Sequence, residues 1–238
     1  MTSSIESARE APSFGPELFA FLADLRAHNE REWFNANKQR YEEQVLEPAL
    51  AFIEDFGYRL NEISPQLRAD SRRNGGSLFR IYRDTRFSRD KTPYKTHTGM
   101  HFRHVAAKDV HAPGYYLHLA PDSVFAGAGI WRPDTPTCNK IREAIVARPR
   151  DWRAATVGND AFVERFAGVG GEQLKRVPSS FDPDHEFGDD LRRKGWTASV
   201  ELNRKIATTP GFLDVYTGIC EDAAPMMRFL CRALDLEF

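Results

Sequence analysis

The chain has 238 residues, a formal net charge of −1 at pH 7 and 41% hydrophobic residues. This balance is ordinary for a globular protein with a substantial core, and it excludes a uniformly basic protein that coats nucleic acid. No apolar run approaches the ~20 residues of a membrane span, and the N-terminus lacks the apolar stretch of a secretory signal. We therefore expect a cytoplasmic protein with no membrane partner.

The first part of the chain predicts helices after a disordered tail at residues 1–12. Gly15-Pro16 begins one helix, and Asn29 with Glu32 resembles a capping box for the next. Pro48 predicts either a kink or a new helix start, since proline cannot donate a hydrogen bond within a helix. The apolar pattern then continues to Ile63.

The middle of the chain alternates apolar and polar residues, which predicts β-strands. The expected strands are Leu78–Tyr82, Thr96–His104, Tyr115–Leu119, Val124–Ile130 and Trp196–Leu202. A Pro-Asp-Ser turn at residues 121–123 joins two of them as an antiparallel hairpin.

Helices return after the strands. Thr135-Pro136 predicts a cap and first residue for one helix, and Thr209-Pro210 starts the last. The order helix, strand, helix predicts a single α+β domain over residues 13–238, with a mostly antiparallel sheet and helical layers from both ends of the chain.

Residues 72–103, called the basic segment, are the most distinctive part of the sequence. They contain nine Lys or Arg and only two acids, Asp84 and Asp90. Interspersed aromatic and apolar residues indicate a strand running into a loop, so the charge lies on a folded surface that suits an anion. The candidate anion-binding residues are Arg80, Arg83, Arg86, Lys91, Lys95, His97, His101 and Arg103, with Arg132, Lys175 and Arg176 as secondary candidates.

Three functions are compatible with the basic segment. The first is a binding module for a phosphorylated or polyanionic ligand, RNA and DNA included, with a stacking ring exposed among Tyr82, Phe87 and Tyr94. The second is an enzyme acting on a small anionic substrate in a concave pocket, with Asp84, Asp90 or His97 as acid or base. The third is a structural or interaction protein whose arginines form internal ion pairs with Asp and Glu.

His97 and His101 have the spacing of two metal ligands on a helix, but the surrounding residues predict a strand. Four strand residues span roughly 13 Å, which is too long for one metal ion, so no metal site is expected. On a strand, His97, Gly99, His101 and Arg103 share one face. Gly99 leaves that face open to a ligand or to a close-packed neighbour.

Three cysteines, an odd number without a CxxC pair, indicate neither a disulfide framework nor a zinc site. Each lies in an apolar helical pattern, so we expect buried free thiols at Cys138, Cys220 and Cys231. Nucleotide-binding and hydrolase motifs are absent, and no cofactor is predicted. We interpret Asp182-Pro183-Asp184-His185 as a turn and helix cap in preference to a carboxylate pair for Mg²⁺ or acid-base chemistry.

Four stretches together resemble a known family. They read GGSLFRIYRDTRFSRDKTPYKTHTGMHFRH, PGYYLHLAPDSVFAGAGIWRPDT, IREAIVARPRDW and LKRVPSSFDPDH. They are similar to the bacterial and fungal family called domain of unknown function 2461, over a span from about Glu17 to near the C-terminus. The resemblance implies a shared fold and no particular activity, because the family has no established one.

Overall fold

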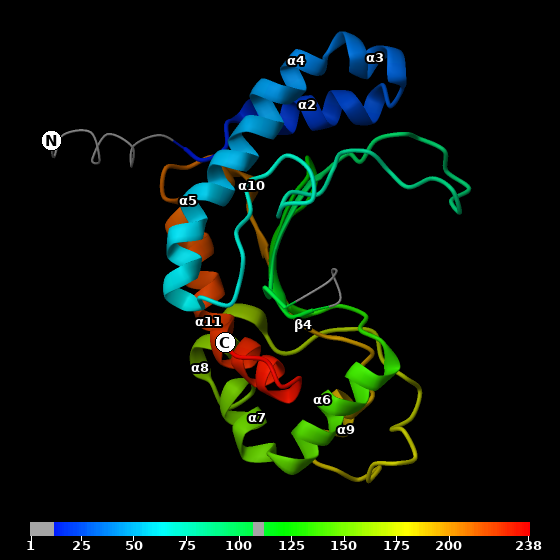
Figure 1. Cartoon of the computed structure of the whole chain (residues 1–238), viewed down its shortest axis with the longest axis vertical. Coiled ribbons are helices and arrows are strands. Elements are labelled where there is room, and N and C mark those ends of the chain that lie inside the picture. The colour runs from blue at the N-terminus through cyan, green and yellow to red at the C-terminus, as the bar shows by residue number, and fades with distance from the viewer. Residues whose placement is uncertain (1–11, 107–111) are drawn as a thin grey trace, which may run out of the picture.

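The N-terminal helices pack as a hairpin at one end of the molecule (Figure 1). The computed structural model describes residues 12–106 and 112–238, so almost all of the predicted tail lies outside the described residues. The hairpin consists of α2 (Pro16–Ala27), α3 (Arg31–Ala36) and α4 (Lys38–Tyr41). The capping box predicted at Asn29 is wrong. Glu30 is the N-cap of α3, without a side-chain cap, because the Asn29 amide is engaged by the backbone of Tyr94.

A π-helical turn, η2 (Glu42–Leu46), connects α4 to the long helix α5 (Glu47–Ile63). Pro48 lies in the first turn of α5, so it marks a new helix start. Proline has no N–H and its ring would crowd the carbonyl four residues earlier. The wider π turn removes this clash without ending the helix.

The sheet has four antiparallel strands in the order β1-β2-β3-β4. Their bounds are β1 (Thr98–Arg103), β2 (Gly114–Leu119), β3 (Val124–Ile130) and β4 (Trp196–Leu202). The predicted α+β class is confirmed, and β3 and β4 have the predicted bounds. The turn at residues 121–123 joins β2 to β3 as predicted.

The strand predicted at Leu78–Tyr82 is wrong as a continuous strand. Residues 77–83 do pair with residues 93–101, but only isolated bridges form, at Leu78–Met100 and Tyr82–Tyr94. The Phe79 N–H donates to Gly99 O, whereas Lys95 N–H donates to Ile81 O. One residue therefore separates Phe79 from Ile81, whereas three residues separate Lys95 from Gly99 on the opposite side of the ribbon. This bulge interrupts the ladder and delays the start of β1 to Thr98.

The helices after β3 are α6 (Thr135–Ala147), α7 (Pro149–Ala155), α8 (Asp160–Phe166), α9 (Gly188–Leu191), α10 (Arg204–Ala207) and α11 (Phe212–Ala233). Of these helices, α6 to α9 form the other end of the molecule, α11 lies beside α5 along the sheet, and α10 lies near the N-terminal hairpin (Figure 1). Asp134 caps α6 in place of the predicted Thr135, since its carboxylate accepts the Thr137 N–H. The last helix is capped by Gly211, two residues after Thr209.

The turn predicted at residues 182–185 is present, and the cap predicted there is wrong. The Asp182 carboxylate accepts the N–H of Asp184 at 2.9 Å, which is the local bond that Asp makes in turns. The next helix is α9, and its N-cap is Phe187.

The core lies between one face of the sheet and helices α5 and α11. Phe102 of β1 packs edge-on to Phe56 of α5 at 4.7 Å between ring centroids, and Phe56 packs on Tyr216 of α11 at 4.8 Å. The three cysteines are buried and free, as expected. The opposite face of the sheet turns away from these helices (Figure 1). In residues 12–106 and 112–238, every helix is too short or too polar to cross a membrane.

Candidate functional site

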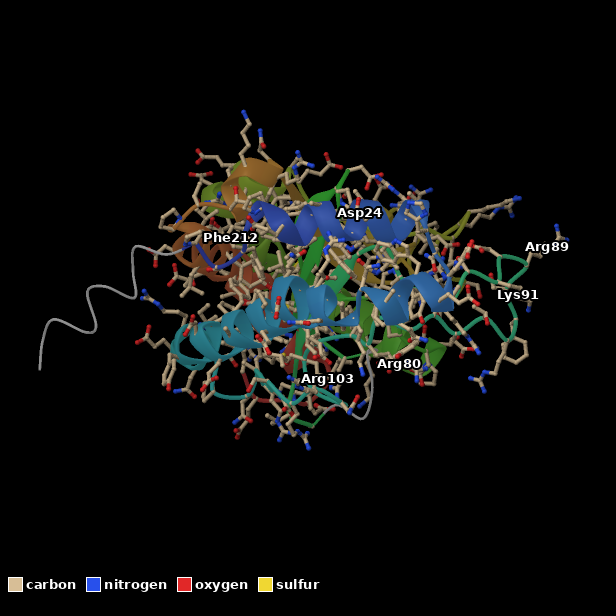
Figure 2. The ribbon with its side chains drawn as sticks, turned by 90° about the horizontal axis from the view of Figure 1, so that it is seen from above. Asp24, Arg80, Arg89, Lys91, Arg103 and Phe212 are labelled. Atoms are coloured by element: carbon tan, nitrogen blue, oxygen red, sulfur yellow. The ribbon has the colours of Figure 1, made fainter. Side chains whose placement is uncertain are left out.

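Residues 77–97 form an irregular ribbon, called the arm, that projects from the sheet. Figure 2 shows Arg89 and Lys91 at its outer end, with Arg80 and Arg103 nearer the body of the molecule. Asn29 of the helical hairpin fixes the arm. Its amide Nδ2 donates to Tyr94 O and its Oδ1 accepts the Tyr94 N–H, both at 3.0 Å. A side chain thus takes the place of a neighbouring strand and satisfies both backbone groups of Tyr94.

The two acids of the arm each pair with one arginine. Asp84 binds the Arg86 guanidinium at 2.6 Å, and Asp90 binds Arg83, which also contacts the Thr92 hydroxyl. The Arg86 hydrogen bonds hold the pKa of Asp84 well below its usual range. The Thr92 N–H, followed by Arg83, lowers the pKa of Asp90 to about 2. Both carboxylates are therefore ionised at neutral pH and are weak bases, which does not favour them as acid-base groups.

The other cations of the arm form no ion pair with the residues that the structure describes. Lys91 Nζ donates to Thr85 O and Lys95 Nζ donates to Arg80 O, each at 2.8 Å. Burial lowers the pKa of Lys95, and the nearby Arg80 adds to this effect. Within the described part of the chain, Arg80, Arg89 and Arg103 form no ion pair. Internal pairing therefore neutralises only part of the basic segment, and positive charge is left in excess.

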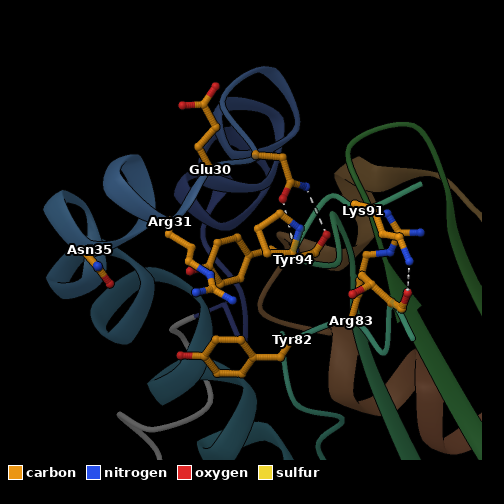
Figure 3. Close-up of a pocket in the computed structure, with 10 residues that line it drawn as sticks. Glu30, Arg31, Asn35, Tyr82, Arg83, Lys91 and Tyr94 are labelled. Carbon is orange, nitrogen blue, oxygen red and sulfur yellow. Dashed lines mark hydrogen bonds between the residues drawn. The ribbon is translucent and has the colours of Figure 1, made fainter. Parts of the chain in front are cut away.

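A cleft of about 610 Å³ separates the arm from the helical hairpin. It is lined by Asn29, Glu30, Arg31, Asn35, Tyr82, Arg83, Thr85, Lys91, Pro93 and Tyr94. Figure 3 shows Arg31 of α3 extending toward the rings of Tyr82 and Tyr94, while Arg83 and Lys91 lie on the arm side. Three cations from two separate elements thus face one hollow, and Glu30, the only acid among the described residues of the lining, points away from them.

Two aromatic rings of the arm are open to solvent. Tyr82 is 53% exposed and Phe87 is 96% exposed, whereas Tyr94 is buried and stacks on Phe34 at 4.2 Å between centroids. The Arg86 guanidinium lies 5.8 Å from the centre of the Phe87 ring. The stacking ring that a nucleic-acid ligand would need is therefore available on the arm.

His101 lies in β1 and His97 lies at the end of the arm directly before it, and neither histidine lines the cleft. His97 stacks on His118 at 4.5 Å between centroids, and its pKa is lowered by burial and by Lys95. Burial, followed by Arg103, lowers the pKa of His101 to about 4. A neutral imidazole attracts an anion only weakly. Three or more His, Cys, Asp or Glu side chains are nowhere grouped to hold a metal ion in the described residues.

Of the two alternatives for Gly99, the structure shows the close-packed neighbour and not the opening for a ligand. A Cβ atom at Gly99 would lie 2.5 Å from Tyr116 Oη and 3.2 Å from the Phe79 ring. These two side chains fill the space, so Gly99 is a packing glycine. His101 and Arg103 share a face as expected, since His101 pairs with Tyr116 and Arg103 with Gly114 in the β1–β2 register. His97 precedes this register and stacks on His118.

The secondary candidates belong to the segments around α6 and α9, which Figure 1 places at the opposite end of the sheet from α2 and α3. Arg132 forms an ion pair with Glu172 at 3.2 Å and lies 5.1 Å from the Trp131 ring centre. Lys175 and Arg176 are exposed, with no ion pair among the residues described. The structure does not bring these three residues to the arm.

The contribution of the helical hairpin to the cleft is not predicted from the sequence. Arg31 and Asn35 lie one helical turn apart at the start of α3, more than 40 residues before the arm. The signal was the polar run His28-Asn29-Glu30-Arg31 between two apolar helical patterns. Such a run is ordinary for a helix connection, and only the fold sets it opposite the arm.

The family described as "Conserved hypothetical protein (DUF2461)" matches residues 17–229. Neither a curated protein nor a solved structure matches the chain.

Proposed function

Since the chain belongs to the DUF2461 family, whose description assigns no activity, we propose a function from the cleft itself. The arm and α3 bind a phosphate-bearing ligand that carries a stackable ring, as in nucleotides and single-stranded nucleic acid. The observation behind this proposal is that Arg31 of α3 faces Arg83 and Lys91 of the arm around the exposed ring of Tyr82.

Like charges on two elements repel unless an anion lies between them. Arg31 has no carboxylate at ion-pair distance in the described residues, and Lys91 contacts only a carbonyl oxygen. These two cations are free to hold a phosphate, whereas Arg83 already binds Asp90. The exposed face of Tyr82 offers a base a stacking surface, worth roughly 1–3 kcal/mol per base in such proteins.

Binding is better supported than catalysis. The concave cleft meets one requirement of an enzyme, but Asp84 and Asp90 are held in ion pairs as stable anions. His97, the third acid-base candidate, does not line the cleft.

The test measures binding of inorganic phosphate, AMP and a fluorescein-labelled 12-nucleotide oligo(dT) at 50 and 200 mM KCl. We expect the oligonucleotide to bind most tightly and to lose affinity steeply with salt. Arg31→Gln and Lys91→Gln should each weaken binding about tenfold and reduce the salt slope by about one. Tyr82→Ala should weaken the binding of AMP and of the oligonucleotide but not the binding of phosphate.

Lys205→Gln is the matched control, because Lys205 is exposed on α10 and outside the cleft. It removes the same charge and should leave affinity unchanged. Equal losses of affinity in Lys205→Gln and Arg31→Gln would show that the ligand is attracted nonspecifically by charge. If the wild type binds none of the ligands at 50 mM KCl, the proposed function is rejected.

A further inference from the structure

A second hollow, of about 550 Å³, lies on the face of the sheet that turns away from α5 and α11. Its aromatic lining consists of Phe79, Tyr116, Phe125 and Trp131, and its polar lining includes His101 and Ser199. It shares no lining residue with the cleft beside the arm. Its volume falls in the range of small-molecule sites, which are mostly apolar with a few polar groups.

The strand register builds this hollow. Tyr116 of β2 pairs with His101 of β1 on one side and with Gly127 of β3 on the other, and Gly127 pairs with Ser199 of β4. These residues therefore project from the same face. Gly127 leaves the floor open, because a Cβ there would meet only Ala198 O at 3.6 Å and Tyr116 Cβ at 4.0 Å.

The neighbouring Gly129 has a different role. Its φ is +122°, and a Cβ there would lie 2.0 Å from Trp196 O. Close approach of β4 thus requires glycine at position 129, whereas no backbone contact requires it at 127. Open space is what the glycine at 127 contributes.

His101 contributes a polar ring to the wall of the hollow. The residue is only 9% exposed, and its Nδ1 is buried with no hydrogen-bond partner among the described residues. Its Nε2 lies beside Gly114, another residue of the lining, where a Cβ would come within 2.6 Å. A buried polar atom without a partner costs stability, and native proteins leave few of them.

Among the residues that the structure describes, the lining contains no Asp, Glu, Lys or Arg. A charged ligand would therefore lose its hydration without gaining an opposite charge, which is strongly unfavourable. We propose that this hollow binds a neutral small molecule with a flat ring and one hydrogen-bonding group. The ring lies over Gly127 among Tyr116, Phe125 and Trp131, and the polar group faces His101.

The test uses benzamide, benzoate and toluene as probes, with ¹⁵N-labelled protein titrated at pH 7 and followed by amide chemical shifts. Benzamide has the ring and the polar group, benzoate adds a charge and toluene lacks the polar group. We expect benzamide to bind in the millimolar range, with shifts centred on β2, β3 and β4, and benzoate to bind there at least about tenfold more weakly.

Two variants locate the site. Gly127→Leu fills the hollow and should abolish binding of benzamide and toluene alike. Gly218→Leu on α11, where a Cβ meets no atom within 4 Å, is the matched control and should bind both probes as the wild type does. His101→Phe keeps a flat, slightly larger ring and removes both nitrogens. This variant should weaken benzamide binding about tenfold and leave the affinity for toluene unchanged.

Three results would each overturn the proposal. They are no benzamide shifts in β2–β4 of the wild type, unchanged benzamide affinity in Gly127→Leu, or equal effects of His101→Phe on benzamide and toluene. Should Gly127→Leu fail to fold, the comparison of the two probes on His101→Phe decides alone. Arg31→Gln should not alter benzamide binding, so failure of this proposal is separate from failure of the phosphate site.

Discussion

His101 shows how one buried side chain links stability to pH. Burial, followed by Arg103, lowers its pKa to about 4 in the folded protein, while an unfolded histidine titrates near ~6.5. Between these values the unfolded chain binds a proton that the folded chain does not. The free energy of unfolding therefore falls as pH decreases through this window, by about 1.4 kcal/mol per pH unit and about 3 kcal/mol in all. Lowered pKa values of His97 and His118 act in the same direction.

We predict that urea unfolding at pH 7.0 to 4.5 will show this loss in the wild type and a shallower one in His101→Phe. The variant should also be at least as stable as the wild type at pH 5, because the unsatisfied Nδ1 is gone. Asp84 and Asp90 have lowered pKa values, so their contributions are lost only at more acidic pH. If the free energy of unfolding of His101→Phe falls with decreasing pH as steeply as that of the wild type, other groups cause the pH dependence.

The arm shows how an irregular element is held in place. Its own pairing is interrupted by the bulge before β1, so its position depends on contacts with the helical hairpin. Asn29 provides two of these contacts and Tyr94 a third, by stacking on Phe34. Two side-chain bonds to one residue fix both the distance and the orientation of the arm.

We predict that Asn29→Ala will cost about 1–3 kcal/mol by leaving the Tyr94 N–H and carbonyl unpaired. The loss should be local, with faster hydrogen exchange at residues 80–96 and unchanged exchange in β3 and β4. Mass spectrometry of peptic fragments measures both regions. Asn37→Ala is the comparison, since its amide bonds to Trp33 within the hairpin and not to the arm. Equal rates of hydrogen exchange in the arm for both variants would contradict the role of the Asn29–Tyr94 hydrogen bonds in holding the arm.

At the scale of the whole molecule, a long segment with little regular structure closes the end opposite the arm. Between α8 and β4 the only helix is the four-residue α9. Arg142 of α6 holds this segment, because its guanidinium donates to Leu191 O at 2.8 Å and to Arg193 O at 2.7 Å. Asp190 joins it to α7 by accepting the Trp152 indole N–H at 2.8 Å.

We predict that Arg142→Met will destabilise the protein by about 2–4 kcal/mol, because two carbonyls lose charge-assisted bonds in a site where Arg142 is 4% exposed. Arg142→Lys should recover less than half of this loss, since an ammonium cannot reach both carbonyls with a fixed fork. Urea unfolding measures both. Arg150→Met, an exposed arginine of α7, should change stability by less than about 0.5 kcal/mol. If Arg142→Met leaves the free energy of unfolding unchanged, the segment is held by its apolar contacts alone.

The sequence by itself determined the elements and where charge gathers. Strand bounds at Val124–Ile130 and Trp196–Leu202 followed from alternation of apolar residues, and helices from apolar spacing, because both patterns reflect neighbours a few residues apart. The composition of residues 72–103 identified the basic segment in the same way. Wrong predictions occurred where a distant partner changed the local preference, as at Asn29, whose amide binds Tyr94 instead of capping α3.

Only the tertiary structure decided what each side chain faces. Gly99 and Gly127 look alike in the sequence, yet Tyr116 and Phe79 fill the space at one and leave it open at the other. Arg31 becomes part of the cleft because the α2–α3 hairpin folds over the arm. The physical reason is that side-chain neighbours separated by tens of residues are set by packing of the whole chain, which local sequence patterns do not encode.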